Sequence, residues 1–168
     1  HRDLHSFPTR RSSDLDLLNM NFPSDSIIKI ELSKEILNCF DIEPQFAFQG
    51  KTDYLLVFDN EYQISNVIPI FNEISKLNVR GVIITAKGNE VDFVSRFFAP
   101  QCGINEDPVT GSAHTTLTPF WSQKLGKTAM TAIQLSKRRG YLQSRYLNDR
   151  VEISGQGKLY LIGNIFLE

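Results

Sequence analysis

The chain of 168 residues contains eighteen basic and nineteen acidic side chains, so its formal net charge is −1. With 41% hydrophobic and 22% charged residues, it has the composition of a globular protein long enough to bury one domain core. The near-neutral charge argues against nucleic acid and against an anionic membrane as partners. Two cysteines, Cys39 and Cys102, are too few for a disulfide framework or a metal cage. We therefore expect free thiols in a reducing cytoplasm and no metal site.

Residues 1–15 show neither helical nor strand periodicity. They also lack the apolar run of about 7 to 15 residues that a secretory signal requires. We interpret them as an artefactual or disordered tail joined to a truncated gene. The remaining residues, 16–168, are expected to form a single domain.

Short elements are predicted in the first third of this domain. Ser33 is expected to cap a helix that continues to Phe40. Two segments rich in aromatic and β-branched residues follow, 44–49 and 52–58, and Gly50 separates them. A glycine between two such segments suits a tight turn, so they predict a β-hairpin.

The middle of the chain predicts a second helix and a second hairpin. Asn66 is expected to cap the helix, whose apolar stripe runs to Leu77, with Pro69 tolerated in its first turn. The apolar run 82–85 and the alternating segment 91–97 are then predicted to pair as strands.

The stretch from Glu106 to His114 reads E-D-P-V-T-G-S-A-H and concentrates the residues suited to chemistry. Apolar residues recur at helical spacing from Ser112 onward, so a helix is predicted to begin near Ser112 and to end at Gly126. Small residues at a helix N-terminus expose backbone N–H groups, and the helix dipole adds positive charge there. An anionic ligand could therefore bind at this helix start, with Asp107 beside it.

Four strand-like segments are predicted after this helix: 129–135, 141–147, 151–153 and 159–167. Many short strands joined by hairpin-like turns, with one nearly apolar helix, predict an α+β domain. We expect a curved, mainly antiparallel sheet wrapped around the central helix that starts near Ser112. Pro119 lies inside that helix and predicts a kink near Thr115 to Leu117.

The sequence from Glu106 to His114 resembles the signature of the phenazine-biosynthesis PhzF-like isomerase family. The likeness continues through Leu117, Pro119, Phe120, Trp121 and Gly126, and it includes Asn21 to Pro23, Arg96 to Pro100 and Ser136 to Gly140. Family members are about twice as long as this chain. What is present resembles their C-terminal half.

The resemblance implies a diaminopimelate-epimerase-like fold, in which two such halves face each other across a cleft. It also implies a catalytic role for Asp107 in proton transfer on a small carboxylate-bearing substrate. Substrate contacts are implied for Glu106, Gly111, Ser112 and Ala113. The family needs no metal or organic cofactor, and some of its members form homodimers.

Each of these residues also has a structural interpretation. Asp107 could be a turn residue before a proline, Glu106 could support the loop, and Ser112 could serve as an N-cap worth about 1 kcal/mol. His114 lies inside the helix and is expected to be packed rather than to act as a base. Cys102 is expected to be a buried, inert thiol.

Three functions are therefore open. The first is the C-terminal half of a PhzF-like isomerase, expected to be inactive alone because the family's acid–base glutamate belongs to the other half. The second is a noncatalytic relic or small-anion-binding module. The third is a cysteine-dependent amino-acid racemase or epimerase that uses Cys102. Residues 159–167 are apolar on both faces, which predicts self-association through that strand.

Overall fold

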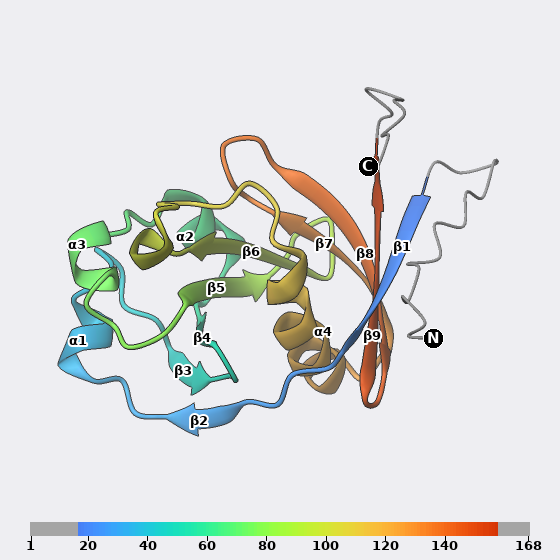
Figure 1. Cartoon of the computed structure of the whole chain (residues 1–168), viewed down its shortest axis with the longest axis horizontal. Coiled ribbons are helices and arrows are strands. Elements are labelled where there is room, and N and C mark those ends of the chain that lie inside the picture. The colour runs from blue at the N-terminus through green and yellow to red at the C-terminus, as the bar shows by residue number, and fades with distance from the viewer. Residues whose placement is uncertain (1–16, 158–168) are drawn as a thin grey trace, which may run out of the picture.

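The computed structural model of the chain describes residues 17–157. In this part of the chain, nine strands form one sheet in the order β1-β9-β8-β7-β6-β5-β4-β3-β2 (Figure 1). Neighbouring strands are antiparallel, except in the parallel pairs β4–β5 and β6–β7. The strands are β1 (Leu17–Pro23), β2 (Ile28–Ile30), β3 (Phe46–Gln49), β4 (Asp53–Val57), β5 (Gly81–Lys87), β6 (Phe93–Phe98), β7 (Ala129–Gln134), β8 (Gly140–Leu147) and β9 (Arg150–Gln156).

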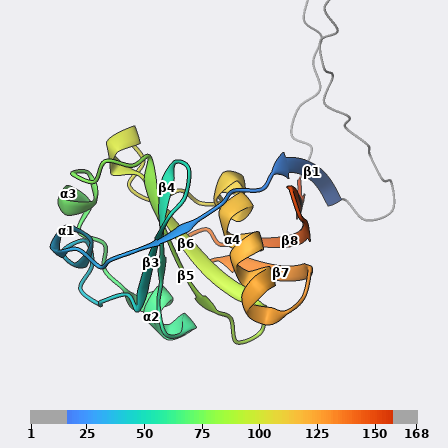
Figure 2. The same cartoon turned by 90° about the horizontal axis from the view of Figure 1, so that it is seen from below.

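The longest helix, α4 (Gly111–Leu125), lies inside the curve of this sheet. Figure 2 shows α4 between strands β3–β6 on one side and strands β7, β8 and β1 on the other. Its residues Leu117, Phe120 and Trp121 pack in one core cluster with Ile83 of β5 and Phe93 of β6. The expected sheet around a central helix is therefore confirmed. The sheet is open, because its end strands β1 and β2 do not pair with each other.

Three short helices cover the other face of strands β4–β6: α1 (Lys34–Leu37), α2 (Glu61–Asn66) and α3 (Phe71–Ile74). Each buries one isoleucine, namely Ile36, Ile64 and Ile74. These side chains belong to a second core cluster with Leu56 and Ile84 of the sheet. Strands β4–β6 are thus buried on both faces, which explains their continuous apolar runs.

Helix α4 ends as predicted, because Gly126 takes the left-handed conformation with φ 66°. Pro119 has no N–H group, so the carbonyl of Thr115 loses its donor within the helix. The backbone N–H of Asp25, in the segment that follows β1, donates to that carbonyl at 3.1 Å. The segment after β1 thus satisfies the carbonyl that Pro119 leaves open.

Several predicted elements are confirmed. Ser33 caps α1, accepting a hydrogen bond from the backbone N–H of Ile36, although that helix ends at Leu37. Both hairpins form, β3 with β4 and β5 with β6. Strands β7, β8 and β9 correspond to three of the four segments predicted near the C-terminus. The fourth, 159–167, lies outside the described residues, as does the tail 1–15.

Of the helix predicted from Asn66 to Leu77, only α3 forms, and the prediction that Asn66 is its N-cap is wrong. Asn60 is the N-cap of α2, and Asn66 is the last residue of that helix. The chain then bends away from the helix direction, because its backbone binds an earlier segment. The Ile68 N–H donates to Asp41 Oδ1, and the Ile68 carbonyl accepts from the Asp41 N–H. The Ile70 N–H donates to the Cys39 carbonyl. Contacts with a segment almost thirty residues earlier thus override the local helical pattern.

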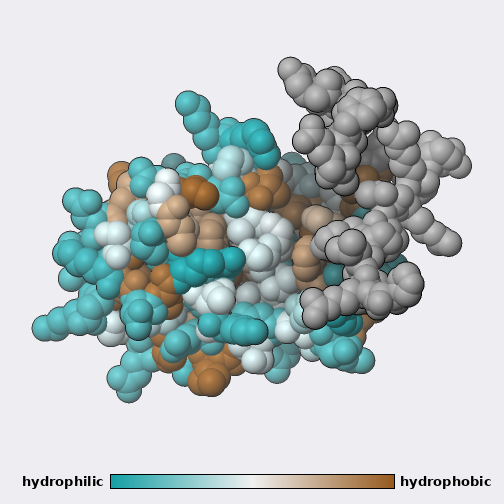
Figure 3. Space-filling view, viewed as in Figure 1, coloured by the Kyte–Doolittle hydropathy of each residue, from teal (hydrophilic) through white to brown (hydrophobic). Residues whose placement is uncertain are grey.

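Hydrophilic and hydrophobic side chains are interspersed over the face seen in Figure 3. The exposed apolar side chains include Leu18 and Met20 on β1 and Ile28 on β2. Within residues 17–157, no helix is both long and apolar enough to cross a membrane.

Candidate active site

The Asp107 loop, residues 105–110, connects strand β6 and the one-turn helix η1 (Pro100–Cys102) to helix α4. The backbone N–H of Asp107 donates to the carbonyl of Phe97 in β6 at 3.0 Å. On the other side, the hydroxyl of Ser136 donates to the Pro108 carbonyl at 2.7 Å. The loop is therefore held between the ends of β6 and β7, and its backbone is fixed where it enters the helix.

The carboxylate of Asp107 is partly exposed and is attached to the start of α4. The Thr110 hydroxyl donates to Asp107 Oδ2 at 2.5 Å. Thr110 occupies the N-cap position, with extended backbone angles φ −108° and ψ 96°, and its side chain does not cap the helix. An N-cap hydroxyl usually accepts from the helix backbone. Here the hydroxyl donates to Asp107 instead, so the Asp107 carboxylate is held beside the helix N-terminus.

The first turn of α4 offers backbone donors to a ligand. N–H groups at the start of an α-helix have no carbonyl four residues earlier to bind, and the dipole places positive charge there. A Cβ atom built on Gly111 would meet none of the described atoms within 4 Å, so space is open in front of this turn. Ala113 buries its methyl group in the core and presents only its backbone here. The substrate contacts predicted for Gly111, Ser112 and Ala113 stay predictions.

Ser112 is not the N-cap, and that prediction is wrong. It is the second residue of α4, is exposed, and its hydroxyl accepts from Arg80 Nη2 at 3.2 Å. Arg80 is itself paired with the buried carboxylate of Asp53. The hydrogen bond with Asp53 raises the pKa of Arg80, which keeps a cation beside Ser112. Sequence spacing did not indicate Arg80, because it lies on the segment leading into β5.

Glu106 is engaged by Arg96 of strand β6. Arg96 Nε donates to Oε1 at 2.7 Å and Nη2 donates to Oε2 at 3.1 Å, a bidentate pair. The third nitrogen of Arg96 donates to the carbonyls of Ile64 and Val67 at the end of α2. Both Glu106 oxygens are thus used to attach the Asp107 loop to α2. Its predicted contact with a substrate stays a prediction.

Two further residues were considered as acid–base or nucleophilic groups. His114 is completely buried, as expected, and its Nδ1 lies 2.9 Å from the Thr110 carbonyl. Cys102 is exposed, so its expected burial is wrong. It ends η1, and its thiol donates to the Arg80 carbonyl at 3.6 Å. Neither residue contacts the Asp107 carboxylate among the hydrogen bonds of residues 17–157.

A groove of about 560 Å³ borders the loop. It is lined by Glu106, Pro108, Ser136, Lys137 and Arg138. Lys137 and Arg138 belong to the turn between β7 and β8, and both bring positive charge to the side of the loop that carries Glu106.

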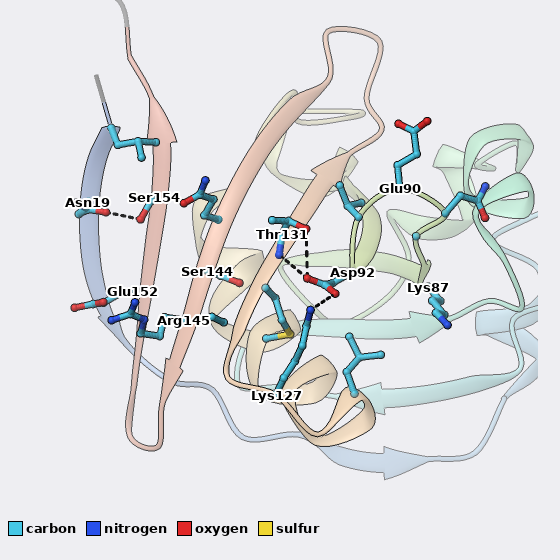
Figure 4. A pocket seen from close by; sticks show the side chains of 18 residues that line it. Asn19, Lys87, Glu90, Asp92, Lys127, Thr131, Ser144, Arg145, Glu152 and Ser154 are labelled. Carbon is cyan, nitrogen blue, oxygen red and sulfur yellow. Dashed lines mark hydrogen bonds and ion pairs between the residues drawn. The ribbon is translucent and has the colours of Figure 1, made fainter. Parts of the chain in front are cut away.

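A larger pocket, about 950 Å³, lies between the turn after β5 and strands β7–β9 and β1 (Figure 4). One ion pair lies in it: Asp92 binds Lys127 at 2.5 Å, and Asp92 also accepts from the Thr131 N–H at 2.8 Å. Ser154 similarly donates to the Asn19 side chain. The Asp107 loop does not line this pocket, so we place the candidate site at the loop instead.

The fold and the loop define a class of protein: an α+β domain that holds an aspartate at the N-terminus of a central helix. The chain belongs to the phenazine biosynthesis-like protein family (PhzC-PhzF), whose sequence profile matches residues 15–163. The resemblance inferred from the stretch Glu106 to His114 is confirmed.

Two bacterial relatives are described as uncharacterized isomerases. An uncharacterized isomerase of Pseudomonas aeruginosa is 49% identical over 152 residues, which are 90% of this chain and 58% of that protein. An uncharacterized isomerase of Halalkalibacterium halodurans is 37% identical over 153 residues, 89% of this chain and 58% of that protein. The chain thus spans somewhat more than half the length of these relatives.

Two crystal structures of PhzF-family proteins share the fold. The protein from Enterococcus faecalis superimposes with a TM-score of 0.84 at 36% identity, covering 91% of this chain and 59% of its own. The protein from Clostridium difficile gives a TM-score of 0.82 at 39% identity, with 92% and 60% covered. The described architecture is therefore that of the family.

Proposed function

We propose that this chain supplies the Asp107 side of the active site of a cofactor-independent isomerase. The reaction is the removal and return of a proton on a small carboxylate-bearing metabolite. Asp107 takes up and releases the proton, and the backbone N–H groups of Gly111, Ser112 and Ala113 bind the substrate carboxylate. Glu106 supports this site through Arg96.

One observation carries this proposal: the Asp107 carboxylate is attached by Thr110 to the N-terminus of a fifteen-residue helix. A bound carboxylate at the open first turn would therefore lie next to a carboxylate that can exchange protons. Positioned acid–base groups accelerate proton transfer by roughly 10²- to 10⁴-fold. Similarity to two bacterial proteins that are described as uncharacterized isomerases supports the same reaction class.

The second acid–base group is proposed to come from the part of a family-length protein that this chain does not cover. The two parts would form a diaminopimelate-epimerase-like pair around a cleft, and the chain alone would be inactive. A cytoplasmic location is also proposed, supported by the two free thiols. One of them, Cys39, is buried, and burial raises its pKa to about 11.

Carboxylate binding is tested by titrating the chain with succinate and following backbone amide shifts. We expect saturable shifts at Gly111, Ser112 and Ala113, because their N–H groups receive the anion. Propionamide, which lacks the charge, serves as the control ligand. Absence of shifts at these three amides with succinate would remove the anion site.

Catalysis is tested in a protein that joins this chain to the segment of the Pseudomonas relative that it does not cover. Small carboxylic acids with an exchangeable C–H are incubated in deuterium oxide, and deuterium incorporation is measured. Asp107→Asn is expected to slow incorporation by roughly 100-fold or more. Asp149→Asn, at an exposed turn residue, is the matched control.

The outcomes separate the three candidate functions. An Asp107→Asn protein as active as its parent would exclude Asp107 from the chemistry. Amide shifts without any deuterium incorporation would favour the noncatalytic anion-binding module. Activity that disappears when Cys102 is alkylated but survives Asp107→Asn would favour the cysteine-dependent racemase.

A further inference from the structure

Gln134, the last residue of β7, is completely buried and makes three hydrogen bonds to the Asp107 loop. Its Nε2 donates to the Asp107 carbonyl at 2.7 Å and to the Thr110 hydroxyl oxygen at 3.2 Å. Its Oε1 accepts from the Thr110 backbone N–H at 2.8 Å. A single side chain from a distant strand thus contacts both the acid-bearing residue and the helix N-cap.

The orientation of this carboxamide is unambiguous. The Asp107 carbonyl can only accept a hydrogen bond, so the group facing it is the amide nitrogen. The Thr110 N–H can only donate, so the group facing it is the amide oxygen. Both contacts require the same orientation, and an inverted amide would lose both bonds.

This orientation sets the direction of the next hydrogen bond. A threonine hydroxyl has one proton to donate. Because Gln134 Nε2 donates to Thr110 Oγ1, that proton is directed to Asp107 Oδ2, 2.5 Å away. The sequence of donors is therefore Gln134 amide, Thr110 hydroxyl, Asp107 carboxylate.

From this geometry we propose that Gln134 and Thr110 are positioning residues for Asp107, and this proposal rests on the proposed function. They keep Oδ2 occupied by a hydrogen bond, which leaves Oδ1 as the oxygen that takes up and returns the substrate proton. Oδ1 receives no hydrogen bond from any residue between 17 and 157. The chain thereby selects one oxygen of the carboxylate for the reaction.

Orientation of the carboxylate can be separated from folding of the loop. The backbone of the loop is also held by the Phe97 carbonyl and by the Ser136 hydroxyl, neither of which involves the Thr110 side chain. Thr110→Val removes the hydroxyl at nearly constant shape, whereas Thr110→Ser keeps the hydroxyl and removes a methyl group. Gln134→Leu removes all three hydrogen bonds, but it also leaves the Asp107 carbonyl and the Thr110 N–H without their partner. The Thr110 variants therefore decide whether the carboxylate is oriented by this arrangement.

The first measurement is the ¹³C resonance of the Asp107 carboxyl group in the 168-residue chain. Thr110→Val is expected to move this resonance and Thr110→Ser to restore it. Thr116→Val is the matched control, because it removes a comparable threonine–aspartate hydrogen bond, the 2.9 Å contact with Asp25, elsewhere on α4. A resonance that moves no further in Thr110→Val than in Thr116→Val would overturn the proposal.

The second measurement is deuterium exchange by the joined protein described above. Thr110→Val is expected to lower kcat by roughly 10- to 100-fold with KM nearly unchanged, because the substrate carboxylate still binds while the acid is misoriented. Rescue by Thr110→Ser supports positioning. If Asp107→Asn abolishes exchange while Thr110→Val keeps the parental kcat, the positioning proposal is wrong.

The deuterium-exchange experiment distinguishes failure of the proposed function from failure of the positioning proposal. Exchange that survives Asp107→Asn overturns the proposed function, and the role of Oδ1 with it. The carboxyl resonance then still decides whether Gln134 and Thr110 orient Asp107.

Discussion

His114, the one histidine among residues 17–157, is buried in α4 rather than placed for catalysis. Its Nδ1 faces the Thr110 carbonyl, which can only accept, so Nδ1 carries a proton. Its Nε2 has no hydrogen-bond partner among the described residues, and the ring lies 5.9 Å from the ring of Phe93. Burial in this apolar setting lowers the pKa of His114 to about 4.

This lowered pKa predicts a pH-dependent stability. Between about pH 6.5 and pH 4 the unfolded chain binds a proton at His114 that the folded chain excludes, so the free energy of unfolding falls as the pH falls. Since one pKa unit corresponds to about 1.4 kcal/mol, the loss reaches about 3 kcal/mol near pH 4. Urea unfolding at pH 7 and pH 4.5 should show a smaller difference for His114→Phe than for the parent. Equal differences would show that His114 does not titrate in this way.

At the scale of elements, the Asp107 loop rests against the first residue of β8. A Cβ atom on Gly140 would lie 2.2 Å from Cγ2 and 3.2 Å from Cγ1 of Val109. Valine is branched at Cβ and cannot turn both methyl groups away. Gly140 therefore lets the loop approach β8 closely, while Gln134 and Ser136 hold it from β7.

Gly140→Ala is expected to push Val109 and the Asp107 loop away from β8. We expect a loss of about 1–3 kcal/mol in the free energy of unfolding, typical of overpacking, together with amide shifts at residues 107–112. Gly155→Ala is the matched control, because a Cβ atom on that glycine of β9 would meet none of the described atoms within 4 Å. Thermal unfolding and amide spectra that leave Gly140→Ala indistinguishable from Gly155→Ala would contradict this prediction.

At the scale of the whole molecule, the sheet formed by residues 17–157 has the two edge strands β1 and β2. In the described part of the chain, β1 pairs only with β9, and its residues Leu18 and Met20 are each 50% exposed. An edge strand with exposed apolar side chains can pair with another chain. We propose that homodimers form along β1; the association predicted for residues 159–167 stays a prediction.

Replacing Leu18 and Met20 together by lysine is expected to weaken this association by roughly tenfold or more, because apolar contact is lost and like charges face each other across the edge. Sedimentation velocity over a range of micromolar concentrations measures it. Ile28→Lys, on the opposite edge strand β2, is the control and should leave the association unchanged. If Ile28→Lys weakens association and the β1 variant does not, the contact lies on β2.

The sequence by itself determined the parts of the fold that depend on local patterns. Glycines at 50 and 126 marked a turn and a helix end because each position favours a residue without a side chain. Alternating and continuous apolar runs located the hairpins, because side-chain burial follows backbone period. The stretch Glu106 to His114 identified both the family and the place of the candidate site, since a loop leading into a helix is encoded in consecutive residues.

Tertiary structure alone decided which side chains act on that loop. Arg80, Arg96 and Gln134 lie between 10 and 32 residues from their partners, and their contacts exist only because β5, β6 and β7 lie side by side. The same cause ended the helix predicted from Asn66, where hydrogen bonds to distant residues outweighed local propensity. Sequence patterns report backbone preference and burial, whereas a hydrogen bond between remote residues depends on where folding places both partners.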